Sequence, residues 1–401
     1  MPAIGPAPDV AIVGGGIVGT AAAAFLAEAG VRVRLYEATA IAAGASGRNS
    51  GIVQHPFDPA LAALYRGTLD EYRRLAEDAA GSFALADEPA GLLYVGHDPT
   101  AARDLAVAWA GAWPATAPEV LAGAELTRLE PALAADLAAC RLAIGYPVEP
   151  AAATEAFAAR ARRLGAELVV GGGRAGLVVH AGRVVGIERD GIVEPAGAVI
   201  VGAGPWTPEI LDPAGAWRPI ERSWGVVAAI VVADAPRHAL EAIDIAIEPG
   251  REESTGAASD AVIGADSVAF SLVPAAGSSA LGSTFLPAEP DPAAWLGALR
   301  GAGSRYVPGI ADAPLVGLRR CARPASRDGR PLVGAAPWAD GLWVVAGHGP
   351  WGISTGPGSA RLVVDHLLGR APAASIPAEL AVGRFGSPRA APRETRPRRP
   401  G

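Results

Sequence analysis

The sequence predicts an α/β fold that begins with a Rossmann-like nucleotide-binding unit. Three observations lead to this fold class. Val10–Val13 is a short run of β-branched and apolar residues that fits a buried strand. Gly14, Gly16 and Gly19 follow with the spacing G-x-G-x-x-G, and an alanine-rich segment and a second apolar run then lead to Glu37. In a chain with 51 glycines the motif alone is weak, but this strand–turn–helix–strand–acid order favours a dinucleotide site over an ordinary βαβ unit.

Each part of this unit has a physical role. The first glycine permits the tight turn, the second lets backbone approach a pyrophosphate, and the third lets the helix pack closely on the strand. The helix predicted over 17–29 brings its N-terminus, with Ile17 and Val18, to the diphosphate, where N–H groups and positive potential favour an anion. Glu37 ends the second predicted strand, over 31–36, where a carboxylate binds ribose hydroxyls and disfavours a 2′-phosphate.

Composition limits the class of protein. A chain of 401 residues exceeds one ordinary core, so we expect two domains or one large domain with an insertion. The net charge of −7 argues against a nucleic-acid partner, although all 34 basic residues are arginine. Two cysteines make no disulfide framework, which favours the cytoplasm. We expect no membrane span, because no apolar run reaches about 20 residues. We also expect no signal peptide and no metal site.

Three further segments are rich in glycine and small polar residues. The first, over 44–52, offers N–H groups, hydroxyls and one arginine for a second turn around a diphosphate, or it is a flexible surface loop. The second follows a predicted strand over 199–201 and contains Ala203 and Gly204. The third follows a predicted strand over 342–346 and leads into a helix that ends near Leu368.

These segments, together with the run from Arg323-Pro to Asp328-Gly and Gly334, resemble the D-amino-acid-oxidase-like family of FAD-dependent amine and amino-acid oxidoreductases. That family includes glycine oxidase, sarcosine oxidase and D-amino acid dehydrogenase. The resemblance covers about residues 9–370, but its specific motifs fill only three patches. By position it places FAD contacts at Ala38, Ala45, Ser46, Arg48, Asn49, Ser50, Gly51, Ile52, Arg174, Ala203, Gly204, Gly347, His348, Gly349, Gly352, Ile353 and Ser354.

The resemblance leaves an alternative open at several of these residues. Arg174 is placed by counting without gaps, and the other interpretation is a hairpin arginine in water. His348 and Trp351 belong to a loop that in the family faces the pyrimidine edge of the flavin, where N–H groups stabilise the reduced ring; His348 is otherwise a helix-entry residue. Arg323 is implied to bind the substrate carboxylate, with a salt bridge to Asp328 as the alternative.

The flavin linkage depends on Cys321. Sarcosine-oxidase-like members carry a cysteine seven residues before the acid of this segment, and Cys321 stands seven residues before Asp328. The Arg323-Pro324 pair instead follows glycine-oxidase-like members, which have no such bond. We therefore expect noncovalent FAD, with a covalent bond at Cys321 as the alternative.

The resemblance implies two domains. We expect a discontinuous Rossmann-like FAD-binding domain over 1–80, 143–212 and 312–370, and an α+β substrate domain built on an antiparallel sheet over 81–142 and 213–311. Residues 371–401 form a tail that we expect to be disordered from about 387. Within the substrate domain the pattern predicts a helical segment over 122–139 that is interrupted at Pro131, and a strand over 243–247. It makes Arg222, Trp224 and Arg251 weaker candidates for the substrate cavity.

The implied reaction is oxidation of the C–N bond of an amino acid or secondary amine. The neutral amine gives its α-hydrogen as a hydride to flavin N5, water hydrolyses the imine, and oxygen or another acceptor receives the electrons. Two alternatives remain: an NAD(P)H-dependent flavoprotein monooxygenase, and a non-catalytic flavin-binding subunit of a larger complex. The sequence leaves the substrate, its chirality and the oligomeric state open.

Overall fold

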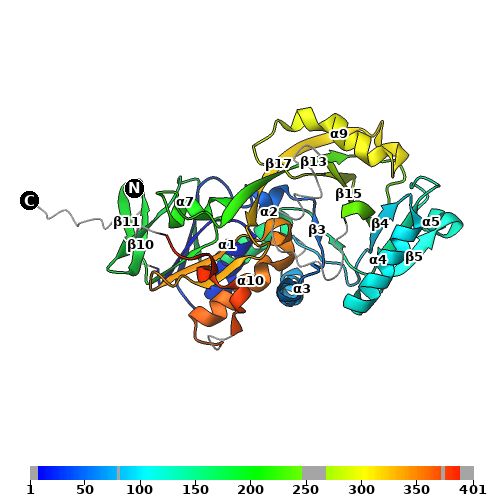
Figure 1. The fold of residues 1–401 in the computed structure, drawn as a ribbon. Helices are drawn as coiled ribbons and strands as arrows, with labels where there is room; N and C mark the ends of the chain where they lie inside the picture. Colours follow the sequence, from blue (N-terminus) through cyan, green and yellow to red (C-terminus); the bar gives the residue numbers. More distant parts are fainter. Residues whose placement is uncertain (1–7, 79–81, 246–267, 372–374, 389–401) are drawn as a thin grey trace, which may run out of the picture.

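Two large sheets organise the computed structural model, which describes residues 8–78, 82–245, 268–371 and 375–388 (Figure 1). The first sheet has six strands, in the order β18 (Leu332–Ala335), β19 (Leu342–Ala346), β12 (Ala198–Val201), β1 (Val10–Val13), β2 (Val33–Glu37) and β8 (Glu167–Val170). All neighbouring strands in it are parallel except β18, which runs antiparallel to β19. The Rossmann-like arrangement predicted from the N-terminal motif is confirmed, as is the return of the chain at β8.

Alternate side chains of β1 enter two different cores, as the period of a strand requires. Val10 and Ile12 pack with the helices α1 (Ile17–Glu28), α3 (Pro59–Asp78), α6 (Ala152–Arg163) and α10 (Gly352–Leu367). Ala11 and Val13 pack against the small meander of β9 (Gly176–His180), β10 (Arg183–Arg189) and β11 (Ile192–Pro195). Both faces of the parallel sheet are therefore covered, which explains the continuous apolar character of β1.

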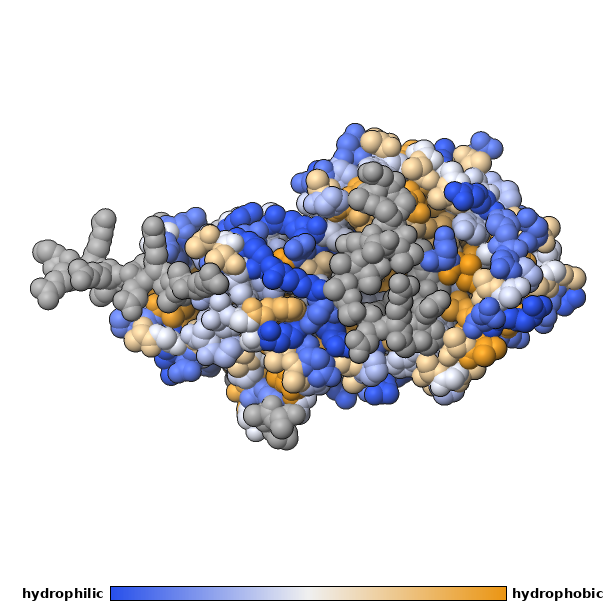
Figure 2. All heavy atoms as spheres, viewed as in Figure 1, coloured by the Kyte–Doolittle hydropathy of each residue, from blue (hydrophilic) through white to orange (hydrophobic). Residues whose placement is uncertain are grey.

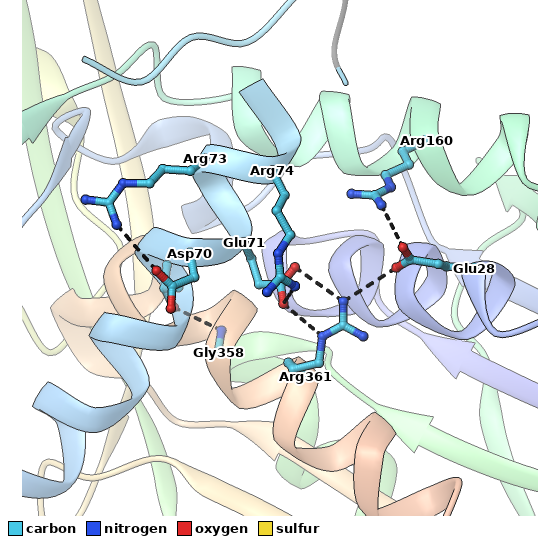
Figure 3. A network of polar contacts seen from close by, with 9 residues as sticks. Glu28, Asp70, Glu71, Arg73, Arg74, Arg160, Gly358 and Arg361 are labelled. Carbon is cyan, nitrogen blue, oxygen red and sulfur yellow. Dashed lines mark hydrogen bonds and ion pairs between the residues drawn. The ribbon is translucent and has the colours of Figure 1, made fainter. Parts of the chain in front are cut away.

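A network of charged side chains joins the four helices that cover one face of this sheet (Figure 3). Arg361 of α10 donates to Glu71 of α3 at 2.9 Å and lies 3.5 Å from Glu28 of α1, which also accepts from Arg160 of α6 at 3.0 Å. The Glu71 side chain is only 5% exposed, so its charge depends on these partners. The network holds α1, whose N-terminus faces the site described below, in a fixed position.

The second sheet has eight strands and is mainly antiparallel. Its order is β17 (Leu315–Ser326), β13 (Ile220–Ile230), β16 (Ser278–Thr284), β15 (Val268–Ala275), β14 (Ala239–Ala242), β4 (Leu92–Gly96), β6 (Ala138–Leu142) and β5 (Glu119–Ala122). One pair, β14 with β4, is parallel. Helices α4 (Pro99–Ala112), α5 (Gly123–Leu129) and α9 (Pro292–Ser304) pack around this sheet, which lies beside the nucleotide-binding half (Figure 1).

The strand β13 belongs to the cores of both halves of the molecule. Ile220, at its start, packs with Val199 and Val201 of the six-stranded sheet. Val226 and Ala228, further along, pack in the core of the eight-stranded sheet. Its partner β17 lies in the same sheet, although the sequence assigned residues 312–370 to the FAD-binding domain. We therefore propose that this domain boundary falls after β17 rather than at 312.

Three sequence-based expectations need correction. The helix expected over 122–139 ends at Leu129, before Pro131, and residues 138–142 form β6, because pairing with β4 and β5 outweighs their alanine content. The strand expected over 243–247 is replaced by β14, just before it, and a 3-10 turn over Ile243–Ile245; residues 246 and 247 lie outside the described residues.

The segment assigned to a tail is folded in its first part. Short 3-10 helices form at Ala378–Leu380 and Val382–Phe385, with Leu380 and Val382 fully buried. Arg384 makes a two-pronged ion pair with Asp328, at 2.7 and 2.9 Å, and this holds the segment on the nucleotide-binding half. Residues 389–401, where disorder was expected, and Arg251 lie outside the described residues.

The surface carries hydrophobic residues in small groups separated by hydrophilic ones on the face shown in Figure 2. Among the described helices, none combines the length and the apolar content needed to cross a membrane.

Candidate active site

A cavity of about 1620 Å³ lies between the carboxyl ends of the parallel strands and one face of the eight-stranded sheet. Ligands of open α/β sheets bind at this end of the strands. The volume exceeds the roughly 300–1,000 Å³ of a pocket for a drug-sized ligand. The cavity therefore has room for a dinucleotide and a small substrate together.

The turn after β1 brings the N-terminus of α1 to the cavity. Gly14 has φ +115°, and a Cβ there would meet the Gly202 carbonyl oxygen at 2.5 Å. Gly16 is the N-cap of α1 and makes no side-chain cap bond, and the first turn carries no acidic residue. Ser46 lies beside it, with its Oγ accepting from the Ile17 N–H at 2.9 Å. A helix N-terminus that begins after a glycine turn and has no acidic residue in its first turn fits a diphosphate.

The Glu37 carboxylate is fixed at the end of β2. One oxygen accepts from the Gly15 N–H at 2.7 Å, and the other accepts from the N–H and hydroxyl of Thr39 at 2.9 and 3.1 Å. Backbone bonds from Gly171 and Gly173 to the carbonyls of Glu37 and Ala38 place the next loop alongside. Arg174, at the end of this loop, is exposed and lies on the cavity wall. The position of Glu37 fits the ribose of an adenosine.

The segment after Glu37 crosses the cavity as a supported turn. It forms α2 (Ala45–Arg48), and Asn49 accepts from the Gly51 N–H at 2.8 Å and donates to the Ala45 and Ser46 carbonyls. Arg319 of β17 donates to the Asn49 carbonyl at 2.9 Å. The Asn49 side chain thus shapes the turn, and the expected flexible-loop alternative does not describe this segment.

A second helix N-terminus, that of α10, also reaches the cavity, and its first turn packs beside the first turn of α1, because a Cβ at Gly356 would lie 3.1 Å from the Val18 side chain. After β19 the chain passes His348 and a 3-10 turn over Gly349–Trp351, and α10 begins at Gly352 with no side-chain cap bond and no acidic residue in its first turn. His348 is 3% exposed, and its Nε2 lies 3.1 Å from the Ser359 hydroxyl. Burial lowers the pKa of His348 to about 4, so the imidazole is neutral near pH 7.

Arg323 projects from β17 over its neighbour β13. A Cβ at Gly225 would meet its guanidinium at 2.4 Å, so a larger residue there would displace the Arg323 side chain. The guanidinium donates to the Thr284 carbonyl at 2.8 Å, contacts the Ser283 hydroxyl and lies 4.5 Å from the centre of the Phe285 ring. The alternative salt bridge to Asp328 is wrong, because Asp328 pairs with Arg384.

Most of the residues that the sequence singled out come together on the cavity wall. Those that line it are Gly14, Gly16, Ile17, Val18, Glu37, Ala38, Ala45, Ser46, Arg48, Asn49, Ser50, Ile52, Arg174, Ala203, Gly204, Cys321, Arg323, His348, Gly349, Trp351, Gly352, Ile353 and Ser354. Gly19, Gly51 and Gly347 are outside this set. At Gly19 a Cβ would meet the Gly14 carbonyl oxygen at 1.9 Å, which shows its packing role.

Two of the weaker candidates lie in the described part of the chain, and neither is on the wall. Arg222 is exposed and pairs with Glu209 at 2.6 Å, and Trp224 lies outside the lining residues. Among the described residues, no group of His, Cys, Asp and Glu is arranged to hold a metal ion.

Sequence reasoning missed a polar group on the cavity roof. Tyr94 of β4, Glu241 of β14 and Gln54, just after β3 (Ile52–Val53), all line the cavity and are linked by side-chain hydrogen bonds. The one signal in the sequence is the single acid in the run Ala239-Leu-Glu-Ala242, an odd residue for a buried strand. The three residues meet only through the pairing of β4 with β14.

Two neighbouring helix N-termini, a fixed acid and a sheet roof carrying an arginine line one cavity and together fit a dinucleotide cofactor beside a small substrate, as in a dinucleotide-dependent oxidoreductase. Residues 9–366 match the family described as FAD dependent oxidoreductase. The chain belongs to that family. The glycine turn, Glu37 and the α10 N-terminus fit FAD.

Relatives with assigned names agree with this family. A D-amino acid dehydrogenase of Cereibacter sphaeroides is 30% identical over 235 residues, covering 59% of this chain and 50% of that protein. The chain thus spans about half the length of the first curated relatives that it matches. The glycine oxidase structure of Geobacillus kaustophilus superposes with a TM-score of 0.77 at 24% identity, over 94% of this chain and 98% of that one. An iminodiacetate oxidase of Chelativorans superposes at 0.73 with 23% identity, over 94% and 99% of the two chains. At these identities the superpositions show the fold.

Proposed function

We propose that this protein oxidises the C–N bond of an amino acid or a secondary amine that carries a carboxylate. The observation that carries the proposal is the Arg323 guanidinium, which lines the same cavity as the α10 N-terminus and is anchored on β16. A planar guanidinium binds a carboxylate through two parallel hydrogen bonds. The names of the relatives, D-amino acid dehydrogenase and glycine oxidase, point to the same substrate class.

FAD, when bound, supplies an acceptor for the hydride that leaves the carbon beside the amine. The turn at Gly14–Gly16 and the α1 N-terminus would hold its diphosphate, and Glu37 would hold the adenosine ribose. The α10 N-terminus would offer backbone donors to the negative charge of the reduced cofactor, and this charge stabilisation needs no titrating residue. His348 stays neutral and positions the loop before α10 through Ser359.

The chain's own residues handle binding and orientation. Arg323 fixes the substrate carboxylate on the cavity roof, and the surrounding apolar wall, including Val227, Ala269 and Phe285, excludes water from the reacting carbon. We favour noncovalent FAD, with oxygen or another molecule as the final electron acceptor and a cytoplasmic location, as the two free cysteines suggest.

Anaerobic spectroscopy of the FAD-loaded protein tests the proposal. A panel of glycine, D- and L-amino acids and N-methylated amino acids is added, and the flavin absorbance is followed. We expect at least one carboxylate-bearing amine to bleach the flavin band within a turnover. Bleaching by NADPH alone would instead identify a monooxygenase, and no bleaching by either would support a non-catalytic flavin-binding subunit.

A further inference from the structure

The cavity roof carries a carboxyl group that the proposed reaction has not yet used. Glu241 lies in the middle of β14, opposite Tyr94 of β4 on one side and Ser271 of β15 on the other. All three residues line the cavity, so this face of the sheet presents a polar row to the substrate space. A carboxyl within a buried sheet is costly unless it is satisfied or has a use.

Two neighbouring side chains influence the protonation of the Glu241 carboxyl. The Tyr94 hydroxyl and the Gln54 amide both bond to it and favour its charged form, while burial opposes that form. The balance raises the pKa of Glu241 to about 7. Gln54 is itself tied to the flavin end of the cavity, because its backbone N–H donates to the Ser354 hydroxyl of α10 at 2.9 Å.

The position of Glu241 relative to Arg323 follows from the sheet register. Glu241 pairs with Ser271, and Ser271 pairs with Gly282 on β16, the strand that anchors the Arg323 guanidinium through Ser283 and Thr284. Two strand spacings, about 10 Å, therefore separate β14 from β16. The two side chains and a small zwitterion can span that distance together. Gly282 has no side chain to fill the space beside Ser271, where a Cβ would come within 2.9 Å of the hydroxyl.

We propose that the Glu241 carboxylate binds the ammonium group of the substrate and takes up one of its protons, while Arg323 holds the substrate carboxylate. This inference rests on the proposed function. An N–H bond of the ammonium breaks, an O–H bond forms on Glu241, and the electron pair stays on nitrogen. The neutral amine is the form from which a hydride can leave, and Glu241 returns its proton to solvent after the product departs.

The ionisable groups around Glu241 set the expected pH dependence. Tyr94 faces it from β4, with Cys140 of β6 beyond; Ser271 faces it from β15; and Arg323, Cys321 and His348 lie elsewhere on the wall. Burial keeps Tyr94 and Cys140 protonated and His348 neutral near pH 7, so Glu241 is the group that titrates there. Its carboxylate, and with it the attraction for a cation, is present above about pH 7 and is lost as the pH falls.

A matched pair of unreactive ligands tests whether the Glu241 carboxylate attracts a cation in the cavity. Glycine betaine carries a carboxylate and a permanent cation, and 3,3-dimethylbutanoate has the same shape without the positive charge. Neither offers a neutral amine, so binding to the FAD-loaded protein is measured by titration without turnover. We expect the wild type to bind betaine about tenfold more tightly than 3,3-dimethylbutanoate at pH 8.5, a preference worth about 1.4 kcal/mol, and to lose that preference at pH 5.5.

Three variants make the test specific. Glu241→Gln keeps the shape and should bind both probes equally at either pH. Tyr94→Phe removes a donor to the carboxylate, so the midpoint of the betaine preference should move to higher pH. Glu221→Gln removes an exposed acid from β13 of the same sheet and should behave as the wild type. Flavin absorbance and circular dichroism confirm that each variant is folded.

The outcomes separate this inference from the proposed function. If amino acids bleach the flavin but the wild type shows no preference for betaine, including the case in which neither probe binds, Glu241 does not bind the ammonium group and the proposed function stands. A preference that persists in Glu241→Gln has the same meaning. If no amine bleaches the flavin, the proposed function fails first.

Discussion

Replacing a single side chain tests whether Arg323 binds the substrate carboxylate. Arg323→Leu removes charge-assisted hydrogen bonds worth roughly 1.5–3 kcal/mol, so kcat/KM for an amino acid should fall about 10- to 150-fold, mainly through KM. Arg320→Leu is the matched control, because Arg320 lies on the same strand and pairs with Glu289 at 2.6 Å. Unchanged kinetics in Arg323→Leu, with FAD still bound, would remove Arg323 from the site.

Cys321 provides a second test at the residue scale. Its side chain is buried, at 4% exposure, and lines the cavity, so it could reach a flavin if the ring lay beside β17. We expect no bond: acid precipitation of the loaded protein should leave the yellow colour in the supernatant, and Cys321→Ala should retain its flavin. Colour that stays in the pellet of the wild type and is lost in Cys321→Ala would establish the covalent link.

Single residues differ in how well the sequence predicts them. Arg323 and Glu37 lie in local motifs whose spacing carries their meaning, and both are found on the cavity wall. Glu241 has no such motif, because its partners Tyr94 and Gln54 are more than 140 residues away in the chain. Only strand pairing brings these residues together, and no local sequence pattern predicts which distant strands will pair.

At the scale of elements, the contact between α1 and the glycine turn is the most sensitive to change. Gly19→Ala would place a Cβ 1.9 Å from the Gly14 carbonyl oxygen, so α1 must move away from β1 and its N-terminus must leave the diphosphate position. We expect FAD binding to weaken by at least about tenfold, or roughly 1.4 kcal/mol, measured by fluorescence titration.

The control for this change is Gly111→Ala in α4, where a Cβ would meet nothing within 4 Å. FAD binding should not change there, and stability should rise by no more than about 1 kcal/mol. Equal FAD affinity in Gly19→Ala and wild type would contradict the close packing of α1 on the turn.

Helices and strands with a strong local sequence pattern could be predicted, whereas those whose conformation depends on pairing with distant strands could not. β1 and α1 follow the expected ranges to within one residue, because apolar periodicity and glycine signals coincide there. The first two residues of β6, Ala138 and Ala139, were assigned to a helix, since alanines favour helix locally and only the pairing with β4 and β5 makes this segment a strand.

At the scale of the whole molecule, the amino-acid composition predicts how fast the reduced protein reacts with oxygen. In sarcosine-oxidase-like members a lysine over the flavin stabilises superoxide, and this chain contains no lysine. His348 cannot replace it while neutral, because burial lowers its pKa to about 4. We therefore expect the reduced protein to react slowly with oxygen and to pass its electrons to another acceptor. Stopped-flow mixing of the reduced protein with air-saturated buffer measures the rate, and fast reoxidation would identify an oxidase.

The site as a whole draws on both sheets, and no single stretch of sequence contains it. The cofactor end comes from segments near residues 14–52, 174, 203 and 348–354, and the roof comes from six strands of the second sheet. The cofactor end could be predicted because a diphosphate needs glycine turns and helix N-termini. The roof could not, because a substrate pocket uses whichever side chains its strands present.

The long antiparallel pair of β13 and β17 also limits how this molecule can move. β13 is anchored in both hydrophobic cores, and an isolated bridge joins Ala325 of β17 to His348 in the loop before α10. Swinging the two halves apart would break strand pairing and tear apart buried apolar contacts in both cores at once. We therefore expect the described part of the chain to disfavour hinge opening, on which many two-domain enzymes rely. Exchange of substrate and product at the flavin end should then depend on local shifts of the loops around the cavity.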